Sequence, residues 1–227
     1  MRERGPQTPG RQMGCMGAEG PDSSGITHLG RPAWVVVLVK DFSTAKQRLQ
    51  PALDPSARRQ LARQNARLAL EAARAGHHVL AVCGSEEAAD LARSAGAEVL
   101  LEERPAGQNP AARRGLELAL SRGASAVLLI SSDLPLVSRV VVAEMLAAGR
   151  RAGGPVVMAA PATGRGGTNA LYLSPPDAIE LHFGDDSLRK FERDAASRGV
   201  LFGLFEAPEL ALDLDEPTDL ATLAARS

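Results

Sequence analysis

An unbroken run of apolar, mostly β-branched residues, Trp34 to Val39 (WVVVLV), constrains the fold of this chain more than any other feature. A strand with one face in water alternates apolar and polar residues, but this run has no polar face, so it predicts a strand buried on both sides. Such strands are typical of parallel sheets that helices cover on both faces. The run therefore predicts an α/β protein.

The rest of the chain repeats this pattern. Ala/Leu/Arg-rich stretches alternate with further apolar runs, at residues 77–83, 97–101, 126–130, 156–160, 168–173 and 200–205. This rhythm predicts strands that alternate with helices over a parallel-type sheet, in one domain that spans residues 33–227. Asp54 and Pro55 predict the start of the first helix, in which Leu61 and Leu68 should face the core.

Residues 1–32 differ from the rest in composition. They are rich in Gly, Pro, Arg and Ser, without the apolar run of a signal peptide, so we expect a disordered leader. The two cysteines, Cys15 and Cys83, cannot form a disulfide framework, and this fits a reducing, cytoplasmic location. No stretch approaches the ~20 apolar residues of a membrane-spanning helix, so a membrane role is excluded.

The charge balance argues against nucleic acid as a partner. The chain has 26 basic and 27 acidic side chains and a formal net charge of -1, so it offers no general attraction to a phosphate backbone. Only 3% of its residues are aromatic, which leaves few side chains for base stacking. A small-molecule ligand is the better expectation.

In an open parallel sheet, ligands bind beyond the carboxyl ends of the strands. Three cations, Lys40, Lys46 and Arg48, follow the first strand and could bind the triphosphate of a nucleotide. The alternative is that they are ordinary solvated loop residues. The segment matches neither the P-loop pattern nor GxGxxG, which disfavours two common classes of nucleotide-binding protein.

Two acidic clusters also follow apolar segments. Asp133 lies in SSDLP, after the strand at 126–130, and Asp213 and Asp215 lie in LDLDEP. Carboxylates beside phosphates are typical Mg²⁺ ligands. The alternatives are that Asp133 only caps a turn and that Asp215 or Glu216 caps the last helix.

A third group joins GRGGTNAL to FGDDS. Thr168, Asn169, the Gly184 amide and Ser187 could together hold a small anion, although a hairpin turn explains GRGG and helix capping explains Ser187. No Ser/His/Asp or Cys/His constellation is present, which disfavours covalent nucleophilic catalysis. A phosphate acceptor, largely ionised at neutral pH, would need no general base.

These motifs occur in a characteristic order: VKDFSTAKQRL, SSDLP, GTNAL, FGDDS and DLDEPTDL. Over residues 34–224 the chain thereby resembles the guanylyltransferases of coenzyme F420 biosynthesis. The resemblance implies a nucleotide-diphospho-sugar-transferase-like, Rossmann-like α/β fold, a three-layer sandwich with a mixed, mostly parallel sheet. It also implies transfer of GMP from GTP to the phosphate of phosphoenolpyruvate or 2-phospho-L-lactate, with release of pyrophosphate.

The resemblance assigns roles by motif. It places the acid substrate on Thr168, Asn169, Gly184 and Ser187, and a Mg²⁺ cofactor on Asp133, Asp213 and Asp215. It places the GTP phosphates on Lys40, Lys46 and Arg48, with Asp133, Lys46 and Arg48 as the catalytic residues. Asn109, in GQN where the family often has GLN, is expected near the nucleotide.

Two alternatives stay open. One is another nucleotidyltransferase, which would use CTP or a sugar phosphate, and the other is a non-catalytic nucleotide-binding module. The choice of acid is open as well, as is whether the protein forms a homodimer.

Overall fold

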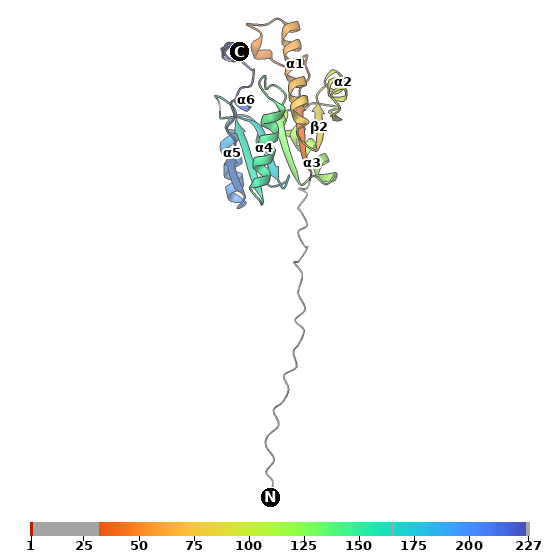
Figure 1. The fold of residues 1–227 in the computed structure, drawn as a ribbon. Helices are drawn as coiled ribbons and strands as arrows, with labels where there is room; N and C mark the ends of the chain where they lie inside the picture. Colours follow the sequence, from red (N-terminus) through yellow and green to blue (C-terminus); the bar gives the residue numbers. More distant parts are fainter. Residues whose placement is uncertain (2–31, 165, 226–227) are drawn as a thin grey trace.

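The computed structural model describes Met1, residues 32–164 and residues 166–225 (Figure 1). The predicted disordered leader, residues 1–32, lies outside the described residues except for its two ends. The strands are β1 (Ala33–Val39), β2 (His78–Cys83), β3 (Glu98–Leu101), β4 (Ala126–Ser131), β5 (Val156–Pro161), β6 (Thr168–Ser174) and β7 (Leu201–Leu204). The helices are η1 (Gln47–Leu49), α1 (Pro55–Ala73), α2 (Glu86–Ser94), α3 (Gln108–Ser121), α4 (Arg139–Arg151), α5 (Ser187–Ser197), α6 (Pro208–Ala211) and α7 (Pro217–Ala224).

The described strands form one seven-stranded sheet in the order β3-β2-β1-β4-β6-β5-β7. Strands β3, β2, β1 and β4 pair in parallel, as does β7 with β5, whereas β6 runs antiparallel to both its neighbours. Strand β6 follows β5 through a hairpin rather than a helical crossover, so it must reverse direction. The mixed, mostly parallel sheet is confirmed, and each predicted strand is found within about a residue of its expected bounds.

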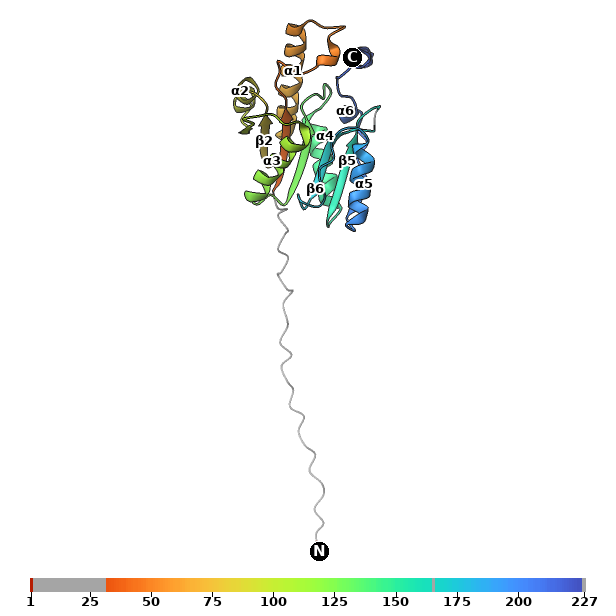
Figure 2. The same cartoon turned by 180° about the vertical axis from the view of Figure 1, so that it is seen from behind.

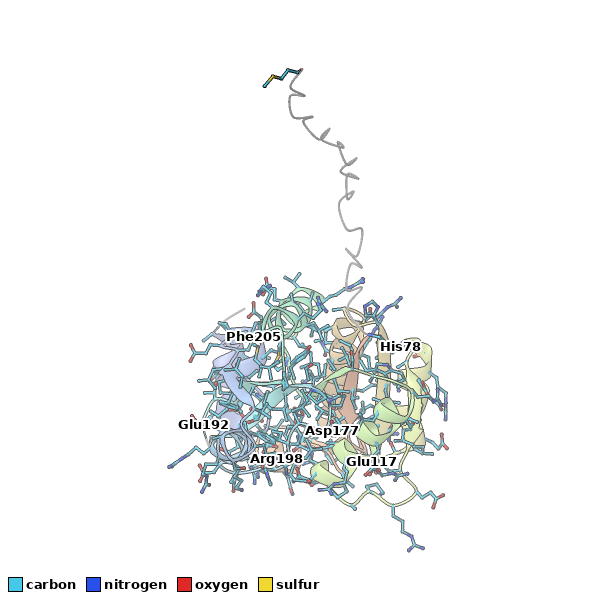
Figure 3. All side chains as sticks on the ribbon, turned by 90° about the horizontal axis from the view of Figure 1, so that it is seen from below. His78, Glu117, Asp177, Glu192, Arg198 and Phe205 are labelled. Atoms are coloured by element: carbon cyan, nitrogen blue, oxygen red, sulfur yellow. The ribbon has the colours of Figure 1, made fainter. Side chains whose placement is uncertain are left out.

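Helices cover both faces of the sheet. Helices α1, α2 and α4 pack on the face toward the viewer in Figure 1, and α3 and α5 pack on the face seen in Figure 2. Figure 3 looks along the sheet from one end, and Glu117 on α3 and Arg198 at the end of α5 lie on the same side. Within the described residues, no helix is long and apolar enough to cross a membrane.

The two-sided burial of β1 explains its unbroken apolar run. Val35 and Val37 belong to the core beneath α1 and α4, whereas Trp34, Val36 and Leu38 belong to the core beneath α3 and α5. Successive side chains of a strand point to opposite faces, so both parities must be apolar. The strand is thus fixed in the centre of the sheet, and its end can carry a site.

The predicted core residues of α1 are wrong. Leu68 is 36% exposed and Leu61 is only half-buried, while the helix buries Ala62, Ala66 and Ala69. These alanines have small side chains, so the helix axis can lie close to the sheet. The larger leucines lie outside this contact stripe.

Helix α3 also approaches the sheet closely, at Gly115. A Cβ atom there would lie 2.7 Å from Cγ1 of Val36 and 2.9 Å from Cγ2 of Val82, so only glycine fits without a shift. This contact holds α3 over β1 and β2. Its N-terminus therefore starts beside the carboxyl ends of these strands, where ligands are expected.

Candidate active site

A cleft of about 530 Å³ opens at the carboxyl ends of the central strands. It is bounded by the loops after β1 and β4, by the start of β6 and by the segment before α7. Most of the predicted site residues line it: Lys40, Arg48, Asp133, Thr168, Asn169, Gly184, Asp213 and Asp215. The chain thus brings together residues from five separate motifs.

Asp133, two residues after β4, is the centre of a charged group. Its Oδ2 lies 3.5 Å from Nζ of Lys46 and 3.9 Å from Nζ of Lys40, and Ser131 donates a hydrogen bond to its Oδ1. Lys46 is buried and has a left-handed backbone, with φ of 60°. Its Nζ also donates to the carbonyl oxygen of Leu214 at 2.5 Å, which ties the loop after β1 to the C-terminal segment.

The surroundings of Asp133 favour its ionised form. Burial alone would raise the pKa of its carboxyl, but the two lysine ammonium groups and the Ser131 hydroxyl together hold that pKa below its usual range. Asp213 behaves in the opposite way. Burial, and then the negative charge of Asp133, raise the pKa of Asp213. The two carboxylates are therefore close enough to repel each other.

Asp215, predicted as a third metal ligand, faces a cation. Its Oδ2 accepts a hydrogen bond from Nη1 of Arg48 at 2.8 Å, and Oε1 of Glu216 lies 3.8 Å from the same nitrogen. In the part of the chain that the structure describes, no three His, Cys, Asp or Glu side chains form a group that could hold a metal ion. Asp133 and Asp213 share one location, whereas Asp215 and Arg48 neutralise each other beside it.

The predicted anion-binding residues Thr168, Asn169 and Gly184 line the same cleft, and the side chain of Asn169 hydrogen-bonds with Asp213. Ser187 is fully buried, and its hydroxyl donates to Oγ1 of Thr168 at 3.0 Å. The N-cap of α5 is Asp186 rather than Ser187, so capping does not explain Ser187. The side-chain amide of Asn169 donates to the carbonyl oxygens of Leu210 at 2.9 Å and Ala211 at 3.3 Å.

Asn109, at the start of α3, makes a two-point contact with the loop before α5. Its Nδ2 donates to the carbonyl oxygen of Phe183 at 2.9 Å, and its Oδ1 accepts from the Phe183 N–H at 2.7 Å. Phe183 immediately precedes Gly184, which lines the cleft. What the structure shows for Asn109 is thus a bond to this loop, while its contact with a nucleotide stays a prediction.

A second, more apolar pocket of about 320 Å³ adjoins the cleft. The two cavities share Lys40, Gln108 and Ser131. The second is also lined by Leu38, Val39, Asp41, Thr44, Val82, Gly84, Glu102, Pro105, Gly107 and Ala111. Sequence reasoning missed Glu102, Gln108 and Ser131. The rule that identified Asp133, an acidic residue directly after an apolar strand, would have identified Glu102 after β3.

Comparison with known proteins identifies a family that matches most of the chain. Residues 33–225 match the family described as "Guanylyl transferase CofC like". Phosphoenolpyruvate guanylyltransferase of Rubrobacter xylanophilus is 38% identical over 85% of this chain and 93% of its own length. The 3-phospho-D-glycerate guanylyltransferase of Colwellia psychrerythraea is 33% identical, over 85% and 91%. The 2-phospho-L-lactate guanylyltransferase of Methanothermobacter thermautotrophicus is 32% identical, over 83% and 82%.

Solved structures show the same fold. A protein named as a nucleotide-diphospho-sugar transferase, from Desulfovibrio desulfuricans G20, superposes with a TM-score of 0.68 over 84% of this chain and 85% of its own. The sequence identity is 15%, so this similarity concerns the fold alone.

Proposed function

The chain belongs to the CofC-like guanylyltransferase family, and from this premise we propose that it transfers GMP from GTP to the phosphate of a phosphorylated three-carbon acid in coenzyme F420 biosynthesis. One observation carries the proposal. Asp133, with Lys46 and Lys40 around its carboxylate, lies beside the junction of an apolar pocket and a polar cleft. Such a junction suits the α-phosphate of a nucleotide whose base and acceptor lie on opposite sides.

The two cavities suggest how the substrates would lie. The base would enter the apolar pocket, and the phosphates would reach Lys40, which lines both cavities. The acid would bind in the cleft, beside Thr168 and the backbone amides near Gly184. This places the two reactants next to each other before any chemistry, which is a large part of what a transferase supplies.

The chemical step needs little from the protein beyond position and charge. An oxygen of the acceptor phosphate attacks the α-phosphorus of GTP, and a new phosphorus–oxygen bond forms. The bond from the α-phosphorus to the bridging oxygen breaks, and its electron pair leaves with pyrophosphate. The acceptor phosphate is already ionised near neutral pH, so no base has to remove a proton. Lys46 and Lys40 would stabilise the charge that develops.

A Mg²⁺ ion fits the acidic part of the cleft, and its binding is part of the proposal. Asp133 and Asp213 lie near each other and offer oxygen ligands, and Mg²⁺ often takes one or two carboxylates, with water and substrate phosphate as its other ligands. Asp215 would have to leave Arg48 to join them. When bound, the ion would stabilise negative charge on the phosphates.

Phosphoenolpyruvate is the acceptor we propose first. Two relatives with that name are 38% and 37% identical to this chain, whereas two relatives named for 3-phospho-D-glycerate are 36% and 33% identical and one named for 2-phospho-L-lactate is 32% identical. All three acids carry one phosphate and one carboxylate on a three-carbon skeleton. They differ by small groups, and such differences are often worth only ~1 to 3 kcal/mol of discrimination.

The test is pyrophosphate release by the purified protein, with each of the three acids offered separately. GTP, ATP, CTP and UTP are compared, with and without Mg²⁺. We expect Mg²⁺-dependent release with GTP and phosphoenolpyruvate. Release with CTP in place of GTP would favour another nucleotidyltransferase. Binding of GTP without release for any acid, by folded protein, would favour a non-catalytic module and refute the proposed function.

A further inference from the structure

We propose that Glu102 selects guanine, because its carboxylate accepts hydrogen bonds from the N1–H and the 2-amino group of a base bound in the apolar pocket. The inference rests on the proposed function and deepens it by naming the residue that discriminates among nucleotides.

The backbone places the Glu102 side chain on the pocket side of the sheet. The Glu102 N–H donates to the Cys83 carbonyl oxygen at 2.9 Å, so the pairing of β3 with β2 continues to this residue. Side chains alternate along a strand, and Leu100, two residues earlier, packs into the core beneath α3. Glu102 therefore points to the face of the sheet that also carries the pocket residues Leu38, Val82 and Ala111.

Glu102 is a largely buried residue whose carboxylate lines the pocket and lacks a partner of its own. The residue is 9% exposed, and within residues 32–164 and 166–225 its carboxylate accepts no hydrogen bond and forms no ion pair. Burial raises the pKa of Glu102, and the more distant charge of Arg114 offsets this only in part. A carboxylate in a largely apolar pocket loses part of its hydration, so hydrogen-bond donors from a ligand would supply what the chain does not.

To select one nucleotide, the Glu102 carboxylate must accept hydrogen bonds from donors that only one of the common bases has. Guanine presents two adjacent donors, N1–H and the 2-amino group, spaced to meet the two oxygens of one carboxylate. Adenine presents an acceptor nitrogen at the same place and no amino group at C2, and neither pyrimidine presents two adjacent donors. The rest of the pocket is largely apolar, as the faces of a base require.

The position of the pocket connects this recognition to the reaction. Lys40, Gln108 and Ser131 line both cavities, and Ser131 donates to the carboxylate of Asp133. A nucleotide with its base at Glu102 would therefore extend its phosphates toward Lys40 and Asp133. The pocket is continuous with the reaction site rather than an isolated surface hollow.

The experiment changes the hydrogen-bond pattern on both sides of the contact. Wild type, Glu102→Gln and Glu102→Ala are assayed with GTP, with ITP, which lacks the 2-amino group, and with XTP, which carries a carbonyl oxygen at C2. Wild type should prefer GTP to ITP by roughly tenfold or more in kcat/KM, the effect of one hydrogen bond to a charged group. Glu102→Ala should bring this ratio close to one.

Glu102→Gln should increase the activity with XTP relative to GTP, a change that damage to the fold would not produce. A carboxamide can accept from N1–H and donate to the 2-carbonyl oxygen, so the XTP-to-GTP ratio should rise by roughly tenfold or more. The matched control is Glu103→Gln, which changes the exposed neighbouring residue in the same way and should leave both ratios unchanged. Unchanged ratios in Glu102→Gln would overturn the proposal.

Binding measurements separate this proposal from the proposed function. Calorimetric titration with GDP, IDP and XDP requires no acid and no turnover. If wild type releases no pyrophosphate, the proposed function fails, yet the same shift in nucleotide preference would still support Glu102. If turnover is present but the preference for guanine is the same in all variants, the assignment of Glu102 fails alone.

Discussion

The two adjoining cavities differ in how they can bind a ligand. The smaller one, about 320 Å³, is mostly apolar and contains the carboxylate of Glu102. The larger one, about 530 Å³, is lined by cations, carboxylates, hydroxyls and glycine backbone. A largely apolar pocket with a few charged groups recognises the edge of a flat uncharged ring, whereas a polar cleft recognises charge. Substitutions in the two cavities should therefore change different kinetic parameters.

The largest effect is expected at the centre of the polar cleft. Asp133→Asn keeps the shape of the side chain but removes the charge near Lys46 and Lys40. We expect kcat for pyrophosphate release to fall roughly 10³-fold, comparable to the loss of a group that stabilises transition-state charge. Nucleotide preference, measured as GTP against ITP, should persist in the remaining activity. A variant with near wild-type kcat would remove Asp133 from the reaction, and Asp177→Asn, at an exposed site, is the control.

A smaller effect on activity is expected at Asn109, which hydrogen-bonds the start of α3 to the loop before α5. Asn109→Ala removes two hydrogen bonds to the Phe183 backbone, and with them the support of the loop that carries Gly184. The KM for the acid should rise about tenfold, while the KM for GTP changes by less than about twofold. Ser138→Ala, which loses one N-cap bond of α4, controls for a general loss of stability. A rise in the GTP KM alone would instead make Asn109 a direct nucleotide ligand, as its motif predicts.

Within the polar cleft, a single hydroxyl should have a weaker effect. Ser187→Ala removes the donor to Thr168 in a fully buried position. The KM for the acid should rise about threefold to tenfold, with little change in the KM for GTP, because the proposed function places only the acid beside Thr168. Steady-state kinetics with the acid and GTP varied in turn measure the two KM values. Equal changes in both KM values would contradict the division between the cavities.

The smallest effect on activity is expected outside both cavities. Asp194 accepts a hydrogen bond from the Glu180 N–H at 2.7 Å and another from Nε of Arg198 at 2.8 Å. Burial alone would raise the pKa of Asp194, but these bonds, with the nearby charges of Arg198 and His182, lower it below its usual range. A lowered pKa means that the stabilisation is present above about pH 4 and is lost as the pH falls through the folded-state pKa.

Asp194→Asn should therefore lower the free energy of unfolding by about 1 kcal/mol at pH 7 and by less at pH 3. Urea unfolding at the two pH values measures this difference, and kinetics at pH 7 should show unchanged KM values. A variant that is destabilised equally at both pH values would contradict the assigned cause.

The parts of the molecule that depend on local pattern could be predicted from sequence. The apolar run of β1 predicted burial on both faces, and the pattern of an acidic residue after an apolar strand predicted that Asp133 lines the cleft at the strand end. The predictions that were wrong concerned features that depend on close packing or on contacts between distant parts of the chain. Leu68 is exposed because α1 packs through its alanines, and no local signal shows which of two apolar stripes will contact the sheet.

The same limit applies to the site. The hydrogen bond from Lys46 to the Leu214 carbonyl oxygen joins residues 168 positions apart. The left-handed backbone of Lys46 cannot be predicted from its residue type. Asp215 was predicted near Asp133, and both line the cleft, but the bond of Asp215 to Arg48 depends on how the C-terminal segment returns to the loop after β1. Motifs predicted most of the residues that line the cleft, and only the fold shows which of them are partners.

The central claim is that GMP is joined to the phosphate of an acid, and ³¹P NMR of the reaction mixture tests it most directly. With GTP, phosphoenolpyruvate and Mg²⁺, we predict two coupled signals of a new diphosphate linkage, in amounts equal to the free pyrophosphate formed. Free GMP or GDP in place of that linkage, with the acid unchanged, would contradict the claim.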